Sequence, residues 1–250
     1  IAPDHLSMGL SEQLPTRRYR DRVADINDLV TALNITAPIW IVAQDWGGAI
    51  AMGYAVAHPD RVAGLVLSNT GIAVPHNRRA PLLIRLAAAS GIHRLVTKES
   101  SLFVRGTPFL PGRGISPAQR TALAFPYRQR NRRNGVADFV ADAPLTARHS
   151  SAQDIADVAE KISALKIPVR LVWGSRDPVF NDDFAHDLMS RFQNVALHRI
   201  ADSGHLTVLE TSIAPFVEAA INKPGESKPH EHLAPRESGD STLWSHIDQW

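Results

Sequence analysis

The sequence contains no cysteine among its 250 residues. Disulfide bonds, thiol catalysis and cysteine-ligated zinc are therefore excluded for this chain. No apolar run approaches the ~20 residues that a membrane-spanning helix needs. A large excess of one charge is also absent, because 27 Lys and Arg stand against 25 Asp and Glu. This near balance argues against a nucleic-acid or membrane-binding surface, so we expect neither a nucleic-acid partner nor a membrane span.

The amino-acid composition and the length of the chain are typical of one globular α/β domain. The chain is 44% hydrophobic and 21% charged, and its length suffices for a full core. It shows no signal peptide, and we expect a cytoplasmic protein. Residue 1 is Ile, and the opening residues read as a strand end entering a loop. We therefore expect the chain to be a fragment whose first strands lie upstream.

Amphipathic helices alternate with short apolar runs in two parts of the sequence. Residues 19–34 have apolar side chains at helical spacing, and the run 39–43 after Pro38 is typical of a strand buried on both faces. Strands and helices that alternate in this way predict an α/β fold, with a mostly parallel sheet flanked by helices. The stripe of the first helix consists of Val23, Ile26, Val30 and Leu33. The predicted strands are 39–43, 60–69, 167–174 and 195–200, and the other predicted helices are 46–58 and about 181–192.

The alternation stops between residues 72 and 160, which contain scattered proline and short helical patterns. We expect a helical lid there, inserted into a core formed by 1–71 and 161–221. Residues 222–241 have almost no apolar side chains and predict a disordered linker. Residues 242–250 become amphipathic again, and we interpret them as the start of a following domain.

Asp45 lies where a buried strand turns into a helix. Small residues stand two places before and after it, at Ala43 and Gly47. A tight strand-to-helix turn needs small residues there, because larger side chains would collide with the neighbouring backbone. This is the pattern of a nucleophile elbow, which lifts its central side chain above the sheet edge near a helix N-terminus. The alternative is that Asp45 only caps helix 46–58.

Two further residues complete the pattern of nucleophile, acid and histidine in that order. Asp177 follows the predicted strand 167–174, and His205 follows the strand 195–200. Carboxyl ends of parallel strands are where open α/β sheets hold their sites. Taken singly, Asp177 could be a turn residue and His205 a surface histidine. Three matching residues, each after a buried strand, favour a catalytic triad.

A carboxylate nucleophile would form an ester between the enzyme and its substrate. His205, oriented by Asp177, would then activate a water molecule to cleave that ester. Trp46 directly follows the nucleophile, and its indole N–H can donate to a leaving group that gains negative charge. The alternative for Trp46 is a packing role. We expect no metal and no cofactor.

The motifs "QDWGG", "WGSRDPVF" and "DSGH" resemble those of the α/β-hydrolase superfamily, in the branch with an Asp nucleophile. That branch contains haloalkane dehalogenases and epoxide hydrolases. "PDHLSMGLS" resembles a loop of the same branch, with Ser7 in place of the first glycine. Some dehalogenases carry their catalytic Glu where this chain has Asn69, so the resemblance places the acid at Asp177. It implies an oxyanion loop upstream of residue 1.

Within this branch the chain is most similar to the β-lactone decarboxylases of bacterial olefin biosynthesis. "DFVADAPL" at 138–145 adds to the resemblance, and "STLWSHIDQW" is similar to the opening of an acyl-adenylating enzyme. The resemblance implies a hydrophobic cis-β-lactone as substrate, an alkene and carbon dioxide as products, and a fused or associated β-lactone synthetase as partner. Haloalkane dehalogenase remains the first alternative. Epoxide hydrolase would normally need two lid tyrosines, whereas only Tyr127 is present, and a non-catalytic docking module is a further alternative.

Two stretches of the predicted lid have alternatives of their own. The run "RQRNRR" at 128–133 predicts a solvated face, with a docking patch as the alternative. The segment 78–96 is rich in apolar residues, which would either line a pocket for alkyl chains or pack the lid onto the core. These residues are Leu82, Leu83, Ile84, Leu86, Ile92, Leu95 and Val96.

Overall fold

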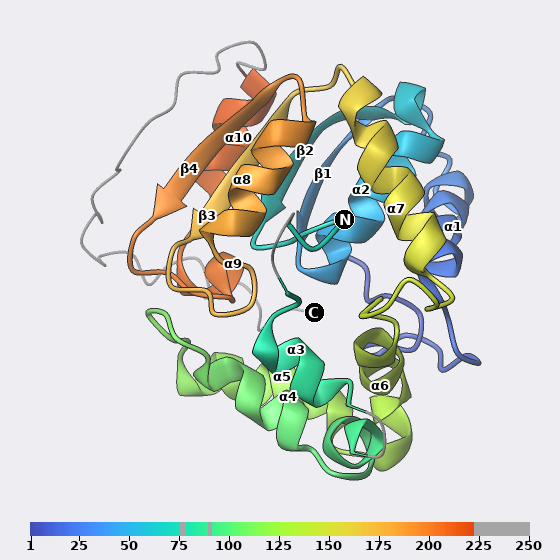
Figure 1. Cartoon of the computed structure of the whole chain (residues 1–250), viewed down its shortest axis with the longest axis vertical. Helices are drawn as coiled ribbons and strands as arrows, with labels where there is room; N and C mark the ends of the chain where they lie inside the picture. The colour runs from blue at the N-terminus through green and yellow to red at the C-terminus, as the bar shows by residue number, and fades with distance from the viewer. Residues whose placement is uncertain (76–78, 90–91, 223–250) are drawn as a thin grey trace.

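The computed structural model describes residues 1–75, 79–89 and 92–222 (Figure 1). The predicted linker at 222–241, apart from its first residue, and the predicted domain start at 242–250 lie outside the described residues. No helix in the described ranges is both long enough and apolar enough to cross a bilayer.

The centre of the molecule is a parallel sheet of four strands in the order β1-β2-β3-β4. Each of the four apolar runs forms a strand, so the predicted parallel sheet is confirmed. Leu65 and Leu67 of β2 point to one face of the sheet and Val66 points to the other, as the two-residue period of a strand requires. The strands are β1 (Ile39–Gln44), β2 (Val62–Ser68), β3 (Val169–Gly174) and β4 (Val195–Ile200).

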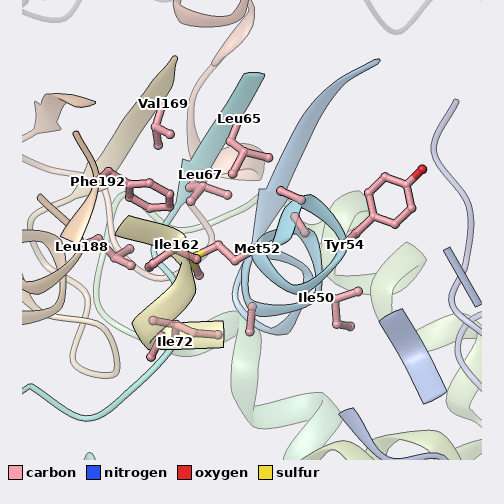
Figure 2. Close-up of a cluster of buried hydrophobic side chains, with 14 of the residues drawn as sticks. Ile50, Met52, Tyr54, Leu65, Leu67, Ile72, Ile162, Val169, Leu188 and Phe192 are labelled. Atoms are coloured by element: carbon pink, nitrogen blue, oxygen red, sulfur yellow. The ribbon is translucent and has the colours of Figure 1, made fainter. Parts of the chain in front are cut away.

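Helices cover both faces of this sheet. The larger core lies on the face that α1, α2, α7 and α8 cover, and α10 covers the other face over β2 and β3. Figure 2 shows Leu65, Leu67 and Val169 of the strands near Met52 and Ile162. These helices and the short α9 are α1 (Tyr19–Ala32), α2 (Trp46–Ala57), α7 (Ala152–Lys161), α8 (Asp182–Arg191), α9 (Thr207–Glu210) and α10 (Ala214–Asn222).

Two burial predictions were wrong. Strand β1 is not buried on both faces, because 45% of Val42 is exposed. Val42 points to the same face as Trp40, and α10 packs mainly over β2 and β3 on that face. Leu33 does not belong to the buried stripe of α1, because it follows the last helical turn and is 45% exposed.

Between β2 and α7 the chain leaves the sheet and forms short helices near the carboxyl ends of the strands (Figure 1). We call residues 79–133 of this part the basic helical segment, for reasons given below. The α-helices are α3 (Leu82–Ala87), α4 (Leu102–Gly106), α5 (Pro117–Ala124) and α6 (Asn134–Ala141). Short 3-10 or π turns are η1 (Pro59–Arg61), η2 (Leu95–Glu99), η3 (Thr107–Phe109), η4 (Phe125–Tyr127), η5 (Arg130–Arg133) and η6 (Ile162–Ala164).

Candidate active site

Asp45 occupies a strained turn between β1 and α2. Its backbone has φ 51° and ψ −128°, a conformation that costs a non-glycine residue about 1–3 kcal/mol and occurs most often at functional sites. The turn is held by the Asp45 N–H, which donates to the Asn69 carbonyl at 3.1 Å. The Asp45 side chain makes no capping hydrogen bond, so the alternative of a simple helix cap lacks its required contact. The side chain is 44% exposed and is free to meet a ligand.

The glycine that this turn requires is Gly48, whereas the sequence predicted Gly47. A Cβ at Gly47 would meet only the Ala43 Cβ, at 3.8 Å, which is an ordinary contact. The predicted collision with backbone at Gly47 was therefore wrong. A Cβ at Gly48 would instead collide with the side chain of Thr70. Thr70 needs that space because its hydroxyl donates to the Asp45 carbonyl at 2.5 Å and fixes the elbow.

The structure brings Asp45, His205 and Asp177 together at the carboxyl ends of β1, β3 and β4. His205 Nδ1 lies 3.0 Å from Asp177 Oδ2, and His205 Nε2 lies 3.6 Å from Asp45 Oδ2. The Asp177 side chain is fully buried, and that of His205 is 7% exposed. The imidazole thus joins a buried carboxylate to a half-exposed one.

This environment raises the pKa of His205 from 6.5 to about 10. Burial by itself lowers the pKa, because it disfavours the charged imidazolium. The hydrogen bonds to Asp177 and then to Asp45, with the negative charges of both, outweigh that effect. The two carboxylates therefore favour the imidazolium form of His205 over the neutral imidazole.

Asn69 is a site residue whose role the sequence did not reveal. Its backbone also has positive φ, 36°, and its side chain is completely buried. The amide nitrogen donates to Asp177 Oδ2 at 3.0 Å and to the Gly174 carbonyl at 3.1 Å. The amide oxygen accepts from the Gly174 N–H and from the Thr207 hydroxyl, both at 2.8 Å. Asn69 therefore orients Asp177 and joins the ends of β2 and β3 to the turn after His205.

The loop that carries His205 has two further supports. Gln44, the residue before Asp45, donates through its side-chain amide to the His205 carbonyl. Glu210 Oε2 accepts from the Ser203 hydroxyl at 2.8 Å and from the Gly204 N–H at 2.6 Å. Gln44 lies in the "QDW" motif, and Glu210 lies five places after His205. The sequence shows these positions, but it does not show the hydrogen bonds that the two side chains make.

Glu210 also connects this loop to the basic helical segment. Its Oε2 accepts from the Arg113 N–H at 3.2 Å. The backbones of Pro111 and Gly204 are so close that a Cβ at Gly204 would collide with the Pro111 carbonyl. A loop between η3 and α5 is therefore fixed directly against the residue that precedes His205.

Asp45 and Trp46 border an apolar cavity of about 420 Å³. This volume lies within the range of small-molecule sites, about 300–1,000 Å³. The motif at 138–145 contributes to its wall, and its buried Asp142 accepts from the Ser151 hydroxyl at 2.6 Å. The large apolar side chains in the wall are Trp46, Ile72, Val74, Ile84, Leu145, Ile155, Phe180 and Phe184.

Trp46 lies where it can serve both of its predicted roles, as a hydrogen-bond donor beside Asp45 and as a packing aromatic residue. It borders the cavity beside Asp45, and its ring also packs against Phe139 with a centroid distance of 5.7 Å. The guanidinium of Arg22 lies 3.5 Å from the Phe139 ring centroid. The packing fixes the indole without removing it from the cavity wall.

Most of the apolar residues singled out in 78–96 follow neither prediction. Only Ile84 lines the cavity. Five others are exposed to solvent rather than packed on the core, because α3 and η2 lie at the outer surface of the molecule. Leu82 is 63%, Leu83 44%, Leu86 53%, Ile92 47% and Leu95 59% exposed.

The chemistry that this site can support follows from its groups. An ionised carboxylate beside an apolar cavity can attack an electrophilic carbon, and a buried histidine with its own acid can hold or transfer a proton. Across the described ranges, no group of three or more His, Asp or Glu side chains is arranged to hold a metal ion.

Comparison with known proteins agrees with this geometry. The family model of the alpha/beta hydrolase fold matches residues 1–212, which confirms the predicted fold class. A cis-3-alkyl-4-alkyloxetan-2-one decarboxylase of Shewanella oneidensis is 28% identical over 220 residues, which cover 85% of this chain and 69% of that protein. Haloalkane dehalogenase 2 of Mycobacterium tuberculosis is 29% identical over 192 residues, covering 72% of this chain and 62% of that protein.

Solved structures show the same fold. The haloalkane dehalogenase DbeA of Bradyrhizobium elkani superposes with a TM-score of 0.74 at 21% identity, over 88% of this chain and 80% of that one. The predicted resemblance is thus confirmed: the chain is similar in sequence to β-lactone decarboxylases and haloalkane dehalogenases, and similar in fold to haloalkane dehalogenases.

Proposed function

The chain belongs to the α/β-hydrolase fold family, and from this premise we propose that it is a β-lactone decarboxylase with Asp45 as its nucleophile. The observation that supports this most is the position of Asp45. Its half-exposed carboxylate stands on a strained turn, beside an apolar cavity and 3.6 Å from a histidine that is paired with a buried acid. The proposed substrate is a cis-β-lactone with two long alkyl chains, and the products are an alkene and carbon dioxide.

In the proposed first step, an Asp45 oxygen attacks the alkyl-bearing ring carbon that is bonded to the ring oxygen, and not the carbonyl carbon. The bond between that carbon and the ring oxygen breaks, which leaves an ester to Asp45 and a free carboxylate on the neighbouring carbon. The N–H groups at the start of a helix have no partner within it, so the first turn of α2 can stabilise the new anion. Trp46 can add its indole N–H at the same place.

In the proposed second step, the bond to the carboxylate breaks and carbon dioxide leaves. The electron pair of that bond forms the carbon–carbon double bond, and Asp45 departs as a carboxylate. Neither water nor a proton is consumed, so His205 need not act as a base. Its raised pKa instead keeps an imidazolium beside Asp45, which orients the nucleophile and stabilises it when it leaves.

The cavity suits the hydrocarbon part of this substrate. Its wall is formed mostly by aliphatic and aromatic side chains, with Ile155 and Phe184 among the larger ones. Each buried CH₂ group contributes about 0.8 kcal/mol, so alkyl chains can supply much of the binding energy.

The test is product analysis with the full-length protein. A long-chain cis-β-lactone should yield the alkene, measured by gas chromatography, and Asp45→Asn should abolish the reaction while the protein stays folded. Halide release from haloalkanes is measured on the same preparation. Halide release without any alkene would overturn the proposal.

Haloalkane dehalogenase is the second candidate, favoured by the position of Trp46 in the cavity wall beside Asp45. In that reaction water must cleave the ester, with His205 as the base. Ester formation removes the negative charge of Asp45 and hence part of what raises the pKa of His205, which would make the imidazole available. A single turnover in ¹⁸O-water separates the two chemistries: hydrolysis labels Asp45, and decarboxylation leaves it unlabelled.

The remaining alternatives have less support. Tyr127, the one tyrosine available for epoxide chemistry in the helical part, is outside the cavity wall, and its hydroxyl accepts from the Gly9 N–H at 2.9 Å. We also retain the proposal that residues 72–160 act as a lid and that an adenylating domain or partner supplies the lactone. Co-purification of such a partner with the full-length protein would test the latter.

A further inference from the structure

We propose that the basic helical segment, residues 79–133, binds the surface of an anionic lipid bilayer. This inference goes beyond the proposed function and does not depend on it. The small net charge of the chain conceals a strong separation of charge. Glu99 is the one acidic residue of this segment, against eleven basic ones. The basic residues are Arg79, Arg85, Arg94, Lys98, Arg105, Arg113, Arg120, Arg128, Arg130, Arg132 and Arg133.

The rest of the described chain has the opposite sign, with twelve Lys and Arg against nineteen Asp and Glu. We expected no basic surface because the numbers of basic and acidic residues in the whole chain are nearly equal. That expectation fails for the basic helical segment, where the basic residues are concentrated. A segment of this charge is attracted to an anionic surface, because each basic residue near such a surface adds roughly 1 kcal/mol.

Most of these basic side chains are available to an outside partner. Seven are exposed, and two of the seven are in ion pairs: Arg130 with Glu99, and Arg113 with Asp202 at 2.6 Å. Arg85, Arg94 and Arg105 have no ion pair with a carboxylate within the described residues. The exposed residues are Arg79, Arg85, Arg94, Arg105, Arg113, Arg128 and Arg130.

The same segment exposes large apolar side chains, which an electrostatic docking surface would not need. Leu82 and Leu86 are one turn apart on α3, are 63% and 53% exposed, and flank the exposed Arg85. Leu102 on α4 is 66% exposed, three residues before Arg105. Such a mixture of Leu, Phe and Arg is typical of helices that lie in the membrane interface. The full set is Leu82, Leu83, Leu86, Ile92, Leu95, Leu102, Phe109, Leu123 and Phe125.

The exposed aromatic rings are paired with arginines. Phe109 is 72% exposed and lies under Arg120 at 5.3 Å, and Phe125 is 50% exposed and lies under Arg128 at 3.9 Å. Each pair presents an apolar ring and a cation at one place. A lipid headgroup region accommodates both, because phosphates meet the guanidinium while the ring enters the acyl boundary.

The position of the segment favours a bilayer over nucleic acid or an acidic protein. Helices α3, α4 and α5 lie together at the end of the molecule beyond the strands' carboxyl ends (Figure 1). Pro81 and Ile84 of the α3 region border the cavity, while Leu82, Leu83 and Leu86 are exposed. A bilayer in contact with α3 would therefore lie next to the cavity wall, where a hydrophobic ligand could pass from lipid to the site.

The test is co-sedimentation of the full-length protein with lipid vesicles. We expect binding to phosphatidylcholine vesicles that contain 30% phosphatidylserine, weak binding to pure phosphatidylcholine, and loss of binding in 0.5 M salt. Arg85→Ser with Arg94→Ser should lower the partition coefficient about 25-fold, since each charge contributes roughly fivefold. Leu82→Ser with Leu86→Ser should lower it about tenfold through lost apolar burial.

Control variants remove exposed residues of the same types from the rest of the chain. Arg20→Ser with Arg148→Ser, and separately Leu10→Ser, should leave the partition coefficient within about twofold of the parent. Circular dichroism melts confirm that each variant is folded. The proposal is overturned if the parent protein ignores anionic vesicles, if the control pair weakens binding as much as the Arg85 pair, or if the leucine pair has no effect.

Discussion

The charge state of His205 should make the stability of the protein depend on pH in a defined direction. Its pKa is raised from 6.5 to about 10 in the folded protein, so between these values the folded state holds a proton that the unfolded state releases. The stabilisation is fully present below pH 6.5 and is lost as pH rises towards 10. The free energy of unfolding should therefore fall across this range on account of His205.

The size of the effect follows from the two contacts. A pKa raised from 6.5 to about 10 corresponds to at most about 5 kcal/mol. The contact with Asp177 is buried and contributes in full, at 3.0 Å. The Asp45 side chain is 44% exposed, so water screens its share, and we expect about 2–3 kcal/mol in total.

Urea unfolding of the parent and of His205→Gln at several pH values between 6 and 9.5 measures this effect. Subtracting the two curves removes the groups that titrate in both proteins. The unfolding free energy of the parent minus that of His205→Gln should shrink by about 2–3 kcal/mol as pH rises. In an Asp177→Asn background the same difference should depend much less on pH. A difference that is constant, or that grows with pH, would refute the assigned contacts.

Substitutions at three other positions test the supports of the site by urea unfolding and by product formation. Asn69→Leu should cost about 3–5 kcal/mol and most of the activity, because it leaves buried partners at Asp177 and Gly174 without their hydrogen bonds; a loss below 1 kcal/mol would contradict this. Glu210→Ala should cost about 2–4 kcal/mol, whereas Glu210→Gln, which keeps an acceptor, should cost clearly less; equal losses would argue against the hydrogen bonds. Gly48→Ala should cost about 1–3 kcal/mol by overpacking against the neighbouring threonine, and an unchanged melting curve would show that the turn has room.

The sheet was predictable from the sequence because strands and helices alternate with clear periods. The apolar run of β2 and the run of β3 are each bounded by polar or turn residues, so their existence did not depend on distant contacts. The exposed face of β1 was not predictable, since it depends on where α10 packs. The outward position of Leu82 and its neighbours was missed for a related reason: apolar composition does not say which surface a short helix presents.

The candidate site was predictable in part. Asp45, Asp177 and His205 each follow a buried strand, and parallel strands bring their carboxyl ends to one edge. The structure places the three within reach of one another, and their catalytic roles stay predictions. Asn69 and Glu210 could not be assigned in advance, because their partners come from distant segments that meet only in the fold.

The contact between Glu210 and the loop at 111–113 couples two motions. Any opening of that loop must break the bond from the Arg113 N–H and uncover the Gly204 backbone, which Pro111 covers. The Arg113 N–H, which loses its acceptor when the loop opens, would then exchange with solvent through loop opening rather than through global unfolding. That single amide thus reports how often the loop at 111–113 separates from the turn that precedes His205.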